Sequence, residues 1–343
     1  MSTSRTREKA DKLTYTQAEV TAGDTAARAG RKNLVLNGSM QVAQRGMATG
    51  VVTGAYNADR WRLLMGSVSP QFTVTQGIGP TGAGKSLKYA TTTASTTTVA
   101  NTYIQVTQNI EGLNLQALAK GTSSAKSVTL SFWVKANQTG TYAVNLWDGT
   151  ATRQNSASYT VSTANTWEKK SIVLGPDTTG TINNDNTVGL ALNFIFAAGS
   201  SYTGGSAGVS AHGSTNYAPN QTVNVAANVG DYWEVAEVQL ETGSVATDFE
   251  HRRFGEILAD CQRYYQIFAG YHYLTQYVNT HKMAHVQLPI TMRATPTMTF
   301  NVNTGSGFTA YNLKNNQISV YRASAYADTS ESYIKDIQLT AEL

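Results

Sequence analysis

The chain has 343 residues and a formal net charge of +4, and only 14% of its residues are charged, well below the quarter that is usual in globular proteins. Seven Lys or Arg and four Asp or Glu lie among the first 32 residues, so the rest of the chain is nearly neutral and nucleic-acid binding by it has no electrostatic support. The single cysteine excludes an intrachain disulfide, and no apolar run suits a signal peptide or the ~20 residues of a membrane helix, so we expect folding in a reducing cytoplasm.

Residues 1–32 are polar, basic and interrupted by Gly and Ala, which predicts an extended N-terminal arm. Two interpretations stay open. The arm is a disordered tail, or it is an anchor that orders against another subunit of a larger particle. In the second case its basic residues are expected to bind the other subunit. They are Arg5, Arg7, Lys9, Lys12, Arg28, Arg31 and Lys32.

Residues 33–250 alternate short β-forming runs with turns rich in Gly, Asn and Thr. Asn37-Gly38 is a strong turn signal, and the apolar residues of Ser127–Lys135 alternate so that they share one face. Regular short strands of this kind predict one jelly-roll-like β-sandwich. The expected strands are Arg60–Met65, Gln71–Gln76, Ser86–Ala90, Thr102–Ile110, Ser127–Ala136, Thr141–Asp148, Trp167–Leu174, Gly189–Ala197 and Tyr232–Leu240. The Gly/Ser-rich stretch Ala198–Asn220 is expected to be a long surface loop.

Residues 251–268 predict a short linker helix, because apolar residues recur there every three or four positions. This stripe consists of Ile257, Leu258, Cys261, Tyr264, Tyr265 and Phe268. Cys261 lies on it and is interpreted as a small buried apolar residue. Residues 269–343 return to strand-like patterns and predict a smaller C-terminal β-domain. Its last strand is expected to carry Tyr333, Lys335, Ile337 and Leu339 on one face.

Three segments resemble a group of tailed-bacteriophage structural proteins. The first reads RKNLVLNGSMQVAQRG at 31–46 with YNADRW at 56–61, and the second reads QNIEG at 108–112 with VTLSFWVKA at 128–136. The third reads EVQLETGSVATDFEHR at 237–252 with LADCQRYY at 258–265, and MRATPT at 292–297 is a weaker match. The group often has Pro where this chain has Asp248. The sandwich itself resembles carbohydrate-binding modules of jelly-roll type.

The resemblance implies a non-enzymatic virion component at the particle surface. A tail fibre or receptor-binding subunit is the first alternative, a capsid decoration, cement or head-fibre protein the second, and an enzyme that degrades surface glycan the third. The expected partners are other virion subunits, host-surface glycan and further copies of the chain, with no nucleic acid and no membrane insertion. We expect folding in the host cytoplasm before release. No cofactor is expected.

Two apparent chemical motifs have simpler interpretations. Gly79–Ser86 matches the phosphate-binding pattern G-x-x-x-x-G-K-[ST], but that site requires a following helix, and the strand-like residues that follow favour a Gly-rich hairpin. His281 and His285 have the spacing of a helical metal pair. On a strand they lie ~13 Å apart, too far to share one ion, and we assign no metal site. No catalytic residue can be selected.

Aromatic residues near turns are the candidates for glycan stacking, namely Trp147, Tyr202 and Tyr217. The alternative is that Trp147 belongs to the core and the tyrosines are ordinary loop residues. The aromatic residues at the end of the predicted helix, Tyr264, Tyr265 and Phe268, are expected to pack between copies of the chain. Together with the resemblance to phage fibres, they predict a homotrimer.

Overall fold

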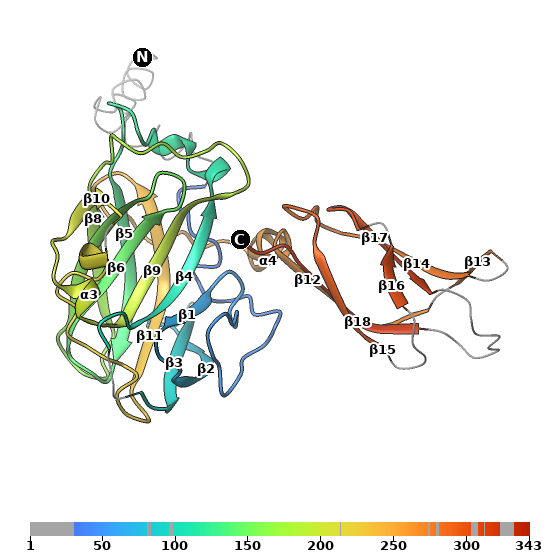
Figure 1. The fold of residues 1–343 in the computed structure, drawn as a ribbon, viewed down its shortest axis with the longest axis horizontal. Coiled ribbons are helices and arrows are strands. Elements are labelled where there is room, and N and C mark those ends of the chain that lie inside the picture. Colours follow the sequence, from blue (N-terminus) through green and yellow to red (C-terminus); the bar gives the residue numbers. More distant parts are fainter. Residues whose placement is uncertain are drawn as a thin grey trace, which may run out of the picture.

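The computed structural model describes residues 31–80, 82, 84–95, 99–212, 214–273, 275–278, 281–302, 308–311, 313–322 and 333–343. The N-terminal arm up to residue 30, with Arg5, Arg7, Lys9, Lys12 and Arg28, lies outside these residues. Figure 1 shows a large β-sandwich, a helix beside it and a smaller β-unit that extends away from the sandwich. The predicted all-β class with a jelly-roll-like sandwich is confirmed. Within the described residues, no helix is long and apolar enough to cross a membrane.

Two antiparallel sheets form the sandwich. The six-stranded sheet has the order β1 (Arg62–Gly66), β4 (Tyr103–Glu111), β9 (Val188–Ala198), β6 (Gly140–Asp148), β7 (Arg153–Val161) and β10 (Gly208–Ala211). The five-stranded sheet has the order β2 (Gln71–Ile78), β3 (Lys85–Thr93), β11 (Tyr232–Thr242), β5 (Val128–Ala136) and β8 (Glu168–Leu174). Two 3-10 turns, η1 (Gly112–Asn114) and η2 (Gln116–Leu118), follow β4.

Side chains that alternate along the strands fill the space between the two sheets. In β5 the side chains of Val128, Leu130, Phe132 and Val134 are buried in the core, as their alternation predicted. Aromatic rings from both sheets meet at the centre, where the ring centroid of Phe194 lies 5.0 Å from that of Phe132. Burial of this apolar surface provides the main driving force for forming the sandwich.

Two strands were not expected from the sequence. β7 reads RQNSASYTV, so it has little apolar alternation, yet it pairs with β6 along its whole length. β10 lies within Ala198–Asn220, which was expected to be a loop, together with the helical turns α3 (Ser200–Thr203) and η3 (Ser214–Asn216). The sheet register, rather than local propensity, places these segments.

The linker helix is shorter than predicted. α4 spans Phe254–Gln262, and the chain already enters strand β12 at Tyr265. Tyr265 and Phe268 therefore lie on a strand and not on the helical stripe. Cys261 is fully buried and free, as expected, in a small cluster with Val42 and Ile257, and its burial raises the pKa of the thiol.

The C-terminal β-unit contains a three-stranded and a four-stranded sheet. The first has the order β12 (Tyr265–Tyr273), β18 (Tyr333–Thr340) and β15 (Thr297–Val302), and the second β13 (Thr275–Val278), β14 (His281–Gln287), β17 (Gln317–Arg322) and β16 (Phe308–Tyr311). The alternation predicted for β18 is wrong in part, because a bulge at Asp336, with φ 52°, turns both Ile334 and Ile337 toward the core.

Candidate functional site

A row of amide side chains crosses the outer face of the six-stranded sheet. Tyr217 donates its hydroxyl to Gln105 Oε1 at 2.5 Å, and Gln105 Nε2 donates to Asn193 Oδ1 at 3.0 Å. Asn193 and Asn145 continue the row at 3.4 Å, and Asn145 Nδ2 reaches Gln154 Oε1 at the same distance. We call Gln105, Asn193, Asn145 and Gln154 the amide row. The four neighbouring strands β4, β9, β6 and β7 contribute one member each.

Residues 199–218 lie over the amide row and hide it from solvent. Ala218 is buried against Ala143 and Ile195, and the ring centroids of Tyr202 and Tyr217 are 5.7 Å apart. The four amides are consequently at most 4% exposed. Buried amides of this kind require hydrogen-bond partners, and here they find them largely in one another.

Two of the three predicted glycan-stacking residues come together, and the third stands apart. Tyr202 and Tyr217 pack side by side within the covering segment. Trp147 lies on β6, half-buried, with its ring 6.2 Å from that of His212 in an edge-on arrangement. Tyr217 is additionally tied through its hydroxyl to Gln105. The three rings therefore form no common stacking platform, and their contact with glycan stays a prediction.

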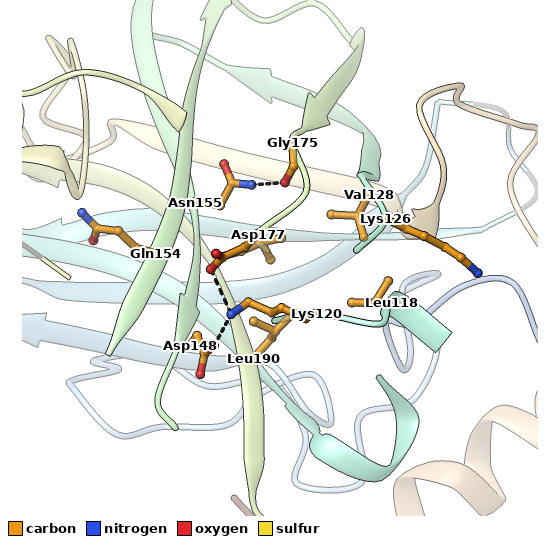
Figure 2. A pocket seen from close by; sticks show the side chains of 11 residues that line it. Leu118, Lys120, Lys126, Val128, Asp148, Gln154, Asn155, Gly175, Asp177 and Leu190 are labelled. Carbon is orange, nitrogen blue, oxygen red and sulfur yellow. Dashed lines mark hydrogen bonds and ion pairs between the residues drawn. The ribbon is translucent and has the colours of Figure 1, made fainter. Parts of the chain in front are cut away.

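A small cavity of about 40 Å³ opens at one end of the sandwich (Figure 2). Its apolar wall includes Leu118, Leu146 and Leu190. Figure 2 shows the Lys120 ammonium group pointing between the carboxylates of Asp148 and Asp177, with a separation of 3.0 Å from Asp177. This ammonium group ties together three loops at the end of the sandwich.

The Asp177 carboxylate beside this cavity is unsuited to proton transfer near neutral pH. Burial favours a higher pKa for Asp177, but hydrogen bonds from Arg153, the Thr179 N–H and Lys120 outweigh it and lower the pKa to about 2. Arg153 Nε lies 2.6 Å from the Asp177 carboxylate. A general acid needs a pKa near the working pH, so Asp177 serves the structure of the loops rather than acid catalysis.

The phosphate-binding pattern at residues 79–86 forms a hairpin, as expected. β2 and β3 pair up to Ile78 and Lys85, and the Gly79 N–H donates to the Gly84 carbonyl at 3.0 Å. Strand β3 follows directly, so there is no helix N-terminus to receive phosphate.

The structure places the two predicted histidines on one strand. His281 and His285 both lie on strand β14, and His285 Nδ1 is 2.7 Å from the Ser319 hydroxyl. Among the described residues, no group of three or more His, Cys, Asp or Glu is arranged to hold a metal ion.

The joint between the sandwich and the C-terminal β-unit contains an extensive charged network. The Glu342 carboxylate accepts from Arg60 and lies 3.2 Å from Arg45 Nη1. The Arg60 guanidinium stacks 3.5 Å above the ring centroid of Tyr264, and that of Arg45 stacks 3.6 Å above Tyr265. Arg60 is only 2% exposed, so its charge depends on these partners.

A second carboxylate completes the joint from the sandwich side. Glu111, at the end of β4, accepts from Arg263 Nη2 at 2.9 Å and lies 3.7 Å from Arg293 Nε. Arg293 Nη2 also donates to the Asn186 carbonyl at 2.5 Å, and Asn186 Nδ2 donates to the Arg293 carbonyl at 2.7 Å. Glu111 thus links the sandwich to two arginines of the region beyond α4.

The segment that opens at residue 33 packs against β11 at the same place. Asn33 Nδ2 donates to the Val238 carbonyl at 3.0 Å, and its Oδ1 accepts from the Leu240 N–H at 3.1 Å. The Asn33 N–H donates to Glu250 at 2.8 Å. Gly38 contacts Val238 so closely that an added Cβ would lie 2.0 Å from the Val238 carbonyl oxygen, which explains why glycine is needed there.

Each of the three segments that carry the phage resemblance contributes residues to this joint, although the runs at 128–136 and 237–252 contribute none. We define the joint by Arg45, Arg60, Glu111, Arg263, Tyr264, Tyr265, Arg293 and Glu342. Of these eight residues only Glu342 lies outside the resembling segments. Sequence reasoning singled out the segments but not their meeting point, because nothing in local periodicity pairs Arg60 with a residue near position 342.

The structure shows what two sets of predicted contact residues touch within their own chain. Arg31 and Lys32 were assigned to the attachment arm, but Arg31 Nη1 lies 3.1 Å from Asp260 and Lys32 Nζ donates to Thr247 and Asp248 of the body. They hold the start of the body in place.

The tyrosines assigned to an oligomer contact are covered by their own chain. Tyr264 is 1% exposed and Tyr265 is 3% exposed, because the guanidinium groups of Arg60 and Arg45 stack on them. Phe268 packs against the core of the C-terminal unit. Tyr264 and Tyr265 therefore supply no free apolar surface for a second copy, and the homotrimer stays a prediction.

No protein-family model and no curated protein matches the chain. Solved structures with a similar fold include a carbohydrate-binding module described as CBM4, at 15% identity over 60% of this chain and 97% of its own, with a TM-score of 0.33. A family 11 carbohydrate-binding module from Clostridium thermocellum is 13% identical over 59% of this chain and 99% of its own, with a TM-score of 0.32. The enzymatically active domain of bacteriophage CBA120 tailspike protein 4 is 16% identical over 57% of this chain and only 21% of its own, with a TM-score of 0.30. The likeness concerns the fold of the sandwich alone.

Proposed function

We propose that this chain is a non-enzymatic structural subunit on the surface of a tailed-phage particle. It is attached through its N-terminal arm and presents a glycan-binding sandwich to the host. The observation that carries this proposal is the joint, where the segments that resemble phage structural proteins meet and lock the sandwich onto the C-terminal β-unit.

A display subunit needs such a joint for a mechanical reason. A binding surface held away from a particle is useful only if its position is fixed relative to the attached part. Buried ion pairs with stacked guanidinium groups fix geometry even where they add little net stability. The resembling residues are thus used for rigidity, and the faces and loops of the sandwich remain available for recognition.

The chemistry of the charged residues supports a role without catalysis. The carboxylates Asp148 and Asp177 are paired with Lys120, and Glu111 and Glu342 are paired with arginines of the joint. Within the proposal, the tail and the head surface are equivalent positions, because both require attachment at one end and display at the other. Assembly as a homotrimer stays part of the proposal, without the tyrosine contact.

The test is a deletion of residues 1–30, which keeps Arg31 and Lys32 because both bind the body. We expect the truncated chain to stay folded and soluble but to be absent from gradient-purified particles of the phage that encodes it, measured by immunoblot. A full-length chain with Lys126→Gln, an exposed lysine of the sandwich, is the control and should be incorporated normally. Normal incorporation of the truncated chain would contradict anchoring by the arm. Absence of the full-length chain from cryo-electron micrographs of the particles would contradict a virion role altogether.

A further inference from the structure

The outer face of the five-stranded sheet combines aromatic rings with lysines. In the sheet register Trp133 lies opposite Lys169, and Glu234 lies between Lys88 and Lys135. Paired residues in neighbouring strands point to the same face. Their neighbours Trp233, Val235 and Val134 point into the core, so this set points outward. We call Lys88, Trp133, Lys135, Trp167, Lys169 and Tyr232 the lysine–aromatic face.

Two of the lysines are held against aromatic rings. The Lys88 ammonium group lies 3.8 Å from the ring centroid of Tyr232, and that of Lys135 lies 4.7 Å from the ring of Trp167. Contacts of this type are favourable for a cation, and they keep the ammonium groups beside the rings. Each pair therefore offers an apolar ring and a positive charge within a few ångströms.

This part of the sheet differs from the other outer surfaces of the sandwich. Residues 199–218 cover the amide row, and the turn after β11 lies over one part of the five-stranded sheet, where Thr129 donates to the Gly243 carbonyl at 2.8 Å. On the lysine–aromatic face Lys169 is exposed and the other five side chains are half-buried. These rings are thus within reach of a ligand from solvent.

The charge of this face is positive, although the sandwich as a whole is nearly neutral. Its three lysines outnumber its one carboxylate, Glu234, which lies 2.8 Å from Lys135 and is almost fully buried. The Glu234 charge is therefore compensated in place, whereas Lys88 and Lys169 remain to attract an anion. A ligand that fits must bring negative charges together with flat apolar surfaces.

We propose that the lysine–aromatic face is the binding site for an acidic glycan, a sugar polymer that carries carboxylate groups. The C–H faces of the sugar rings stack on Trp133 and Trp167, and the carboxylates pair with Lys88 and Lys169. This inference rests on the proposed glycan-binding function and names its ligand class and its location. Because the charges lie at the surface, added salt weakens the binding.

The test uses the purified full-length chain and titration calorimetry with three soluble probes: polygalacturonate, its methyl-esterified form and the neutral glucan laminarin. We expect polygalacturonate to bind, the esterified polymer to bind at least tenfold more weakly, and the double variants W133A/W167A and K88Q/K169Q each to lose at least tenfold in affinity. Lys135 is left unchanged, since its loss would leave Glu234 unpaired. Unchanged thermal melting shows that each variant is folded.

Two matched control variants each remove a residue that lies elsewhere on the chain, one an aromatic residue and the other a lysine. Phe254→Ala and Lys126→Gln both change exposed residues outside this face and should leave the affinity unchanged.

If binding survives in W133A/W167A and K88Q/K169Q but is lost in Trp147→Ala or Tyr202→Ala, the glycan function stands and the face is wrong. If laminarin binds as well as polygalacturonate, the ligand is not acidic and the inference is overturned. Equal binding of a single-stranded DNA oligonucleotide would overturn it in favour of general polyanion attraction, and no binding of any sugar probe would overturn the glycan-binding function as well.

Discussion

Two clusters of buried charge differ in what they connect. In the joint, Glu342 meets Arg60 across 282 positions of sequence, and the guanidinium group lies on the ring of Tyr264. At the end of the sandwich, Lys120 meets Asp148 and Asp177, all within one β-sandwich. The first cluster couples two units, whereas the second closes the loops of one. Buried charge clusters can therefore stabilise either the contact between two units or the loops of one unit. The following substitutions distinguish these two effects.

The largest effect is expected for Glu342→Gln. The substitution leaves Arg60, which is 2% exposed, without its carboxylate, and removal of one partner of a buried pair costs about 3 kcal/mol or more. We expect the free energy of unfolding to fall by that amount and the two units to unfold separately. All five tryptophans lie in the sandwich, so tryptophan fluorescence reports the sandwich and far-UV circular dichroism reports both units. The two melting curves should coincide in the wild type and diverge in the variant.

Glu256→Gln is the matched control for the joint. Glu256 lies on α4 and pairs with Arg252 at 3.5 Å, but its side chain is 51% exposed, and an exposed pair of this kind contributes little. Its two melting curves should stay together. If Glu342→Gln behaves in the same way, the joint does not couple the two units.

A smaller and local effect is expected for Asp177→Asn at the end of the sandwich. The pKa of Asp177 is lowered from 3.8 to about 2 in the folded chain, so its ionised form stabilises the fold by about 2 kcal/mol at neutral pH. Because the folded pKa lies below the unfolded one, this contribution is complete above about pH 4 and is lost as the pH falls from about 4 to 2. The wild type and the variant should differ in urea denaturation at pH 7 and converge near pH 2.

The same experiment distinguishes the cavity cluster from surface carboxylates in general. Asp248→Asn removes an exposed carboxylate and should leave the pH dependence unchanged. In Asp177→Asn, fluorescence and circular dichroism should shift together, because the joint is intact and still couples the two units. Divergence of the two curves would show that this cluster also contributes to coupling and would remove the contrast with Glu342.

Most of the sandwich could be predicted from the sequence, because strands that bury one face alternate in a recognisable way, as in Val128–Ala136. β7 escaped prediction because its core-facing apolar residues, Ala157, Tyr159 and Val161, are confined to its second half, whereas its first half is polar on both faces. The helix was extended too far because Tyr264 and Tyr265 continue its apolar spacing. Their actual partners are arginines more than 200 positions earlier, and such a tertiary contact overrides the local pattern.

The candidate sites were harder to predict than the fold for the same reason. The amide row draws one residue from each of four strands, and the lysine–aromatic face depends on the register of β3, β11, β5 and β8. Apart from Asn145 and Gln154, which are nine positions apart in one hairpin, the neighbours on different strands are far apart in sequence. The sequence offered only candidate residue types, such as Tyr217, whose hydroxyl was found inside the amide row instead of at a stacking surface.

The smallest effect is expected for Tyr217→Phe, which tests a region that belongs to neither charge cluster. The substitution removes the hydroxyl that donates to Gln105 Oε1, and loss of one such hydrogen bond costs about 1 kcal/mol. Because residues 199–218 are held to the sheet by the short edge strand β10 and a small set of side-chain contacts, we expect this loss to appear as local opening rather than as global unfolding. Amide hydrogen exchange should become faster in residues 199–218 and stay unchanged in the joint and around Lys120. Tyr202→Phe keeps the ring contacts of Tyr202 with Tyr103 and Tyr217 and serves as the control. A shift of the whole urea transition as large as that of Asp177→Asn would show that the covering segment is an integral part of the sandwich, as tightly coupled to it as the loops that Lys120 holds.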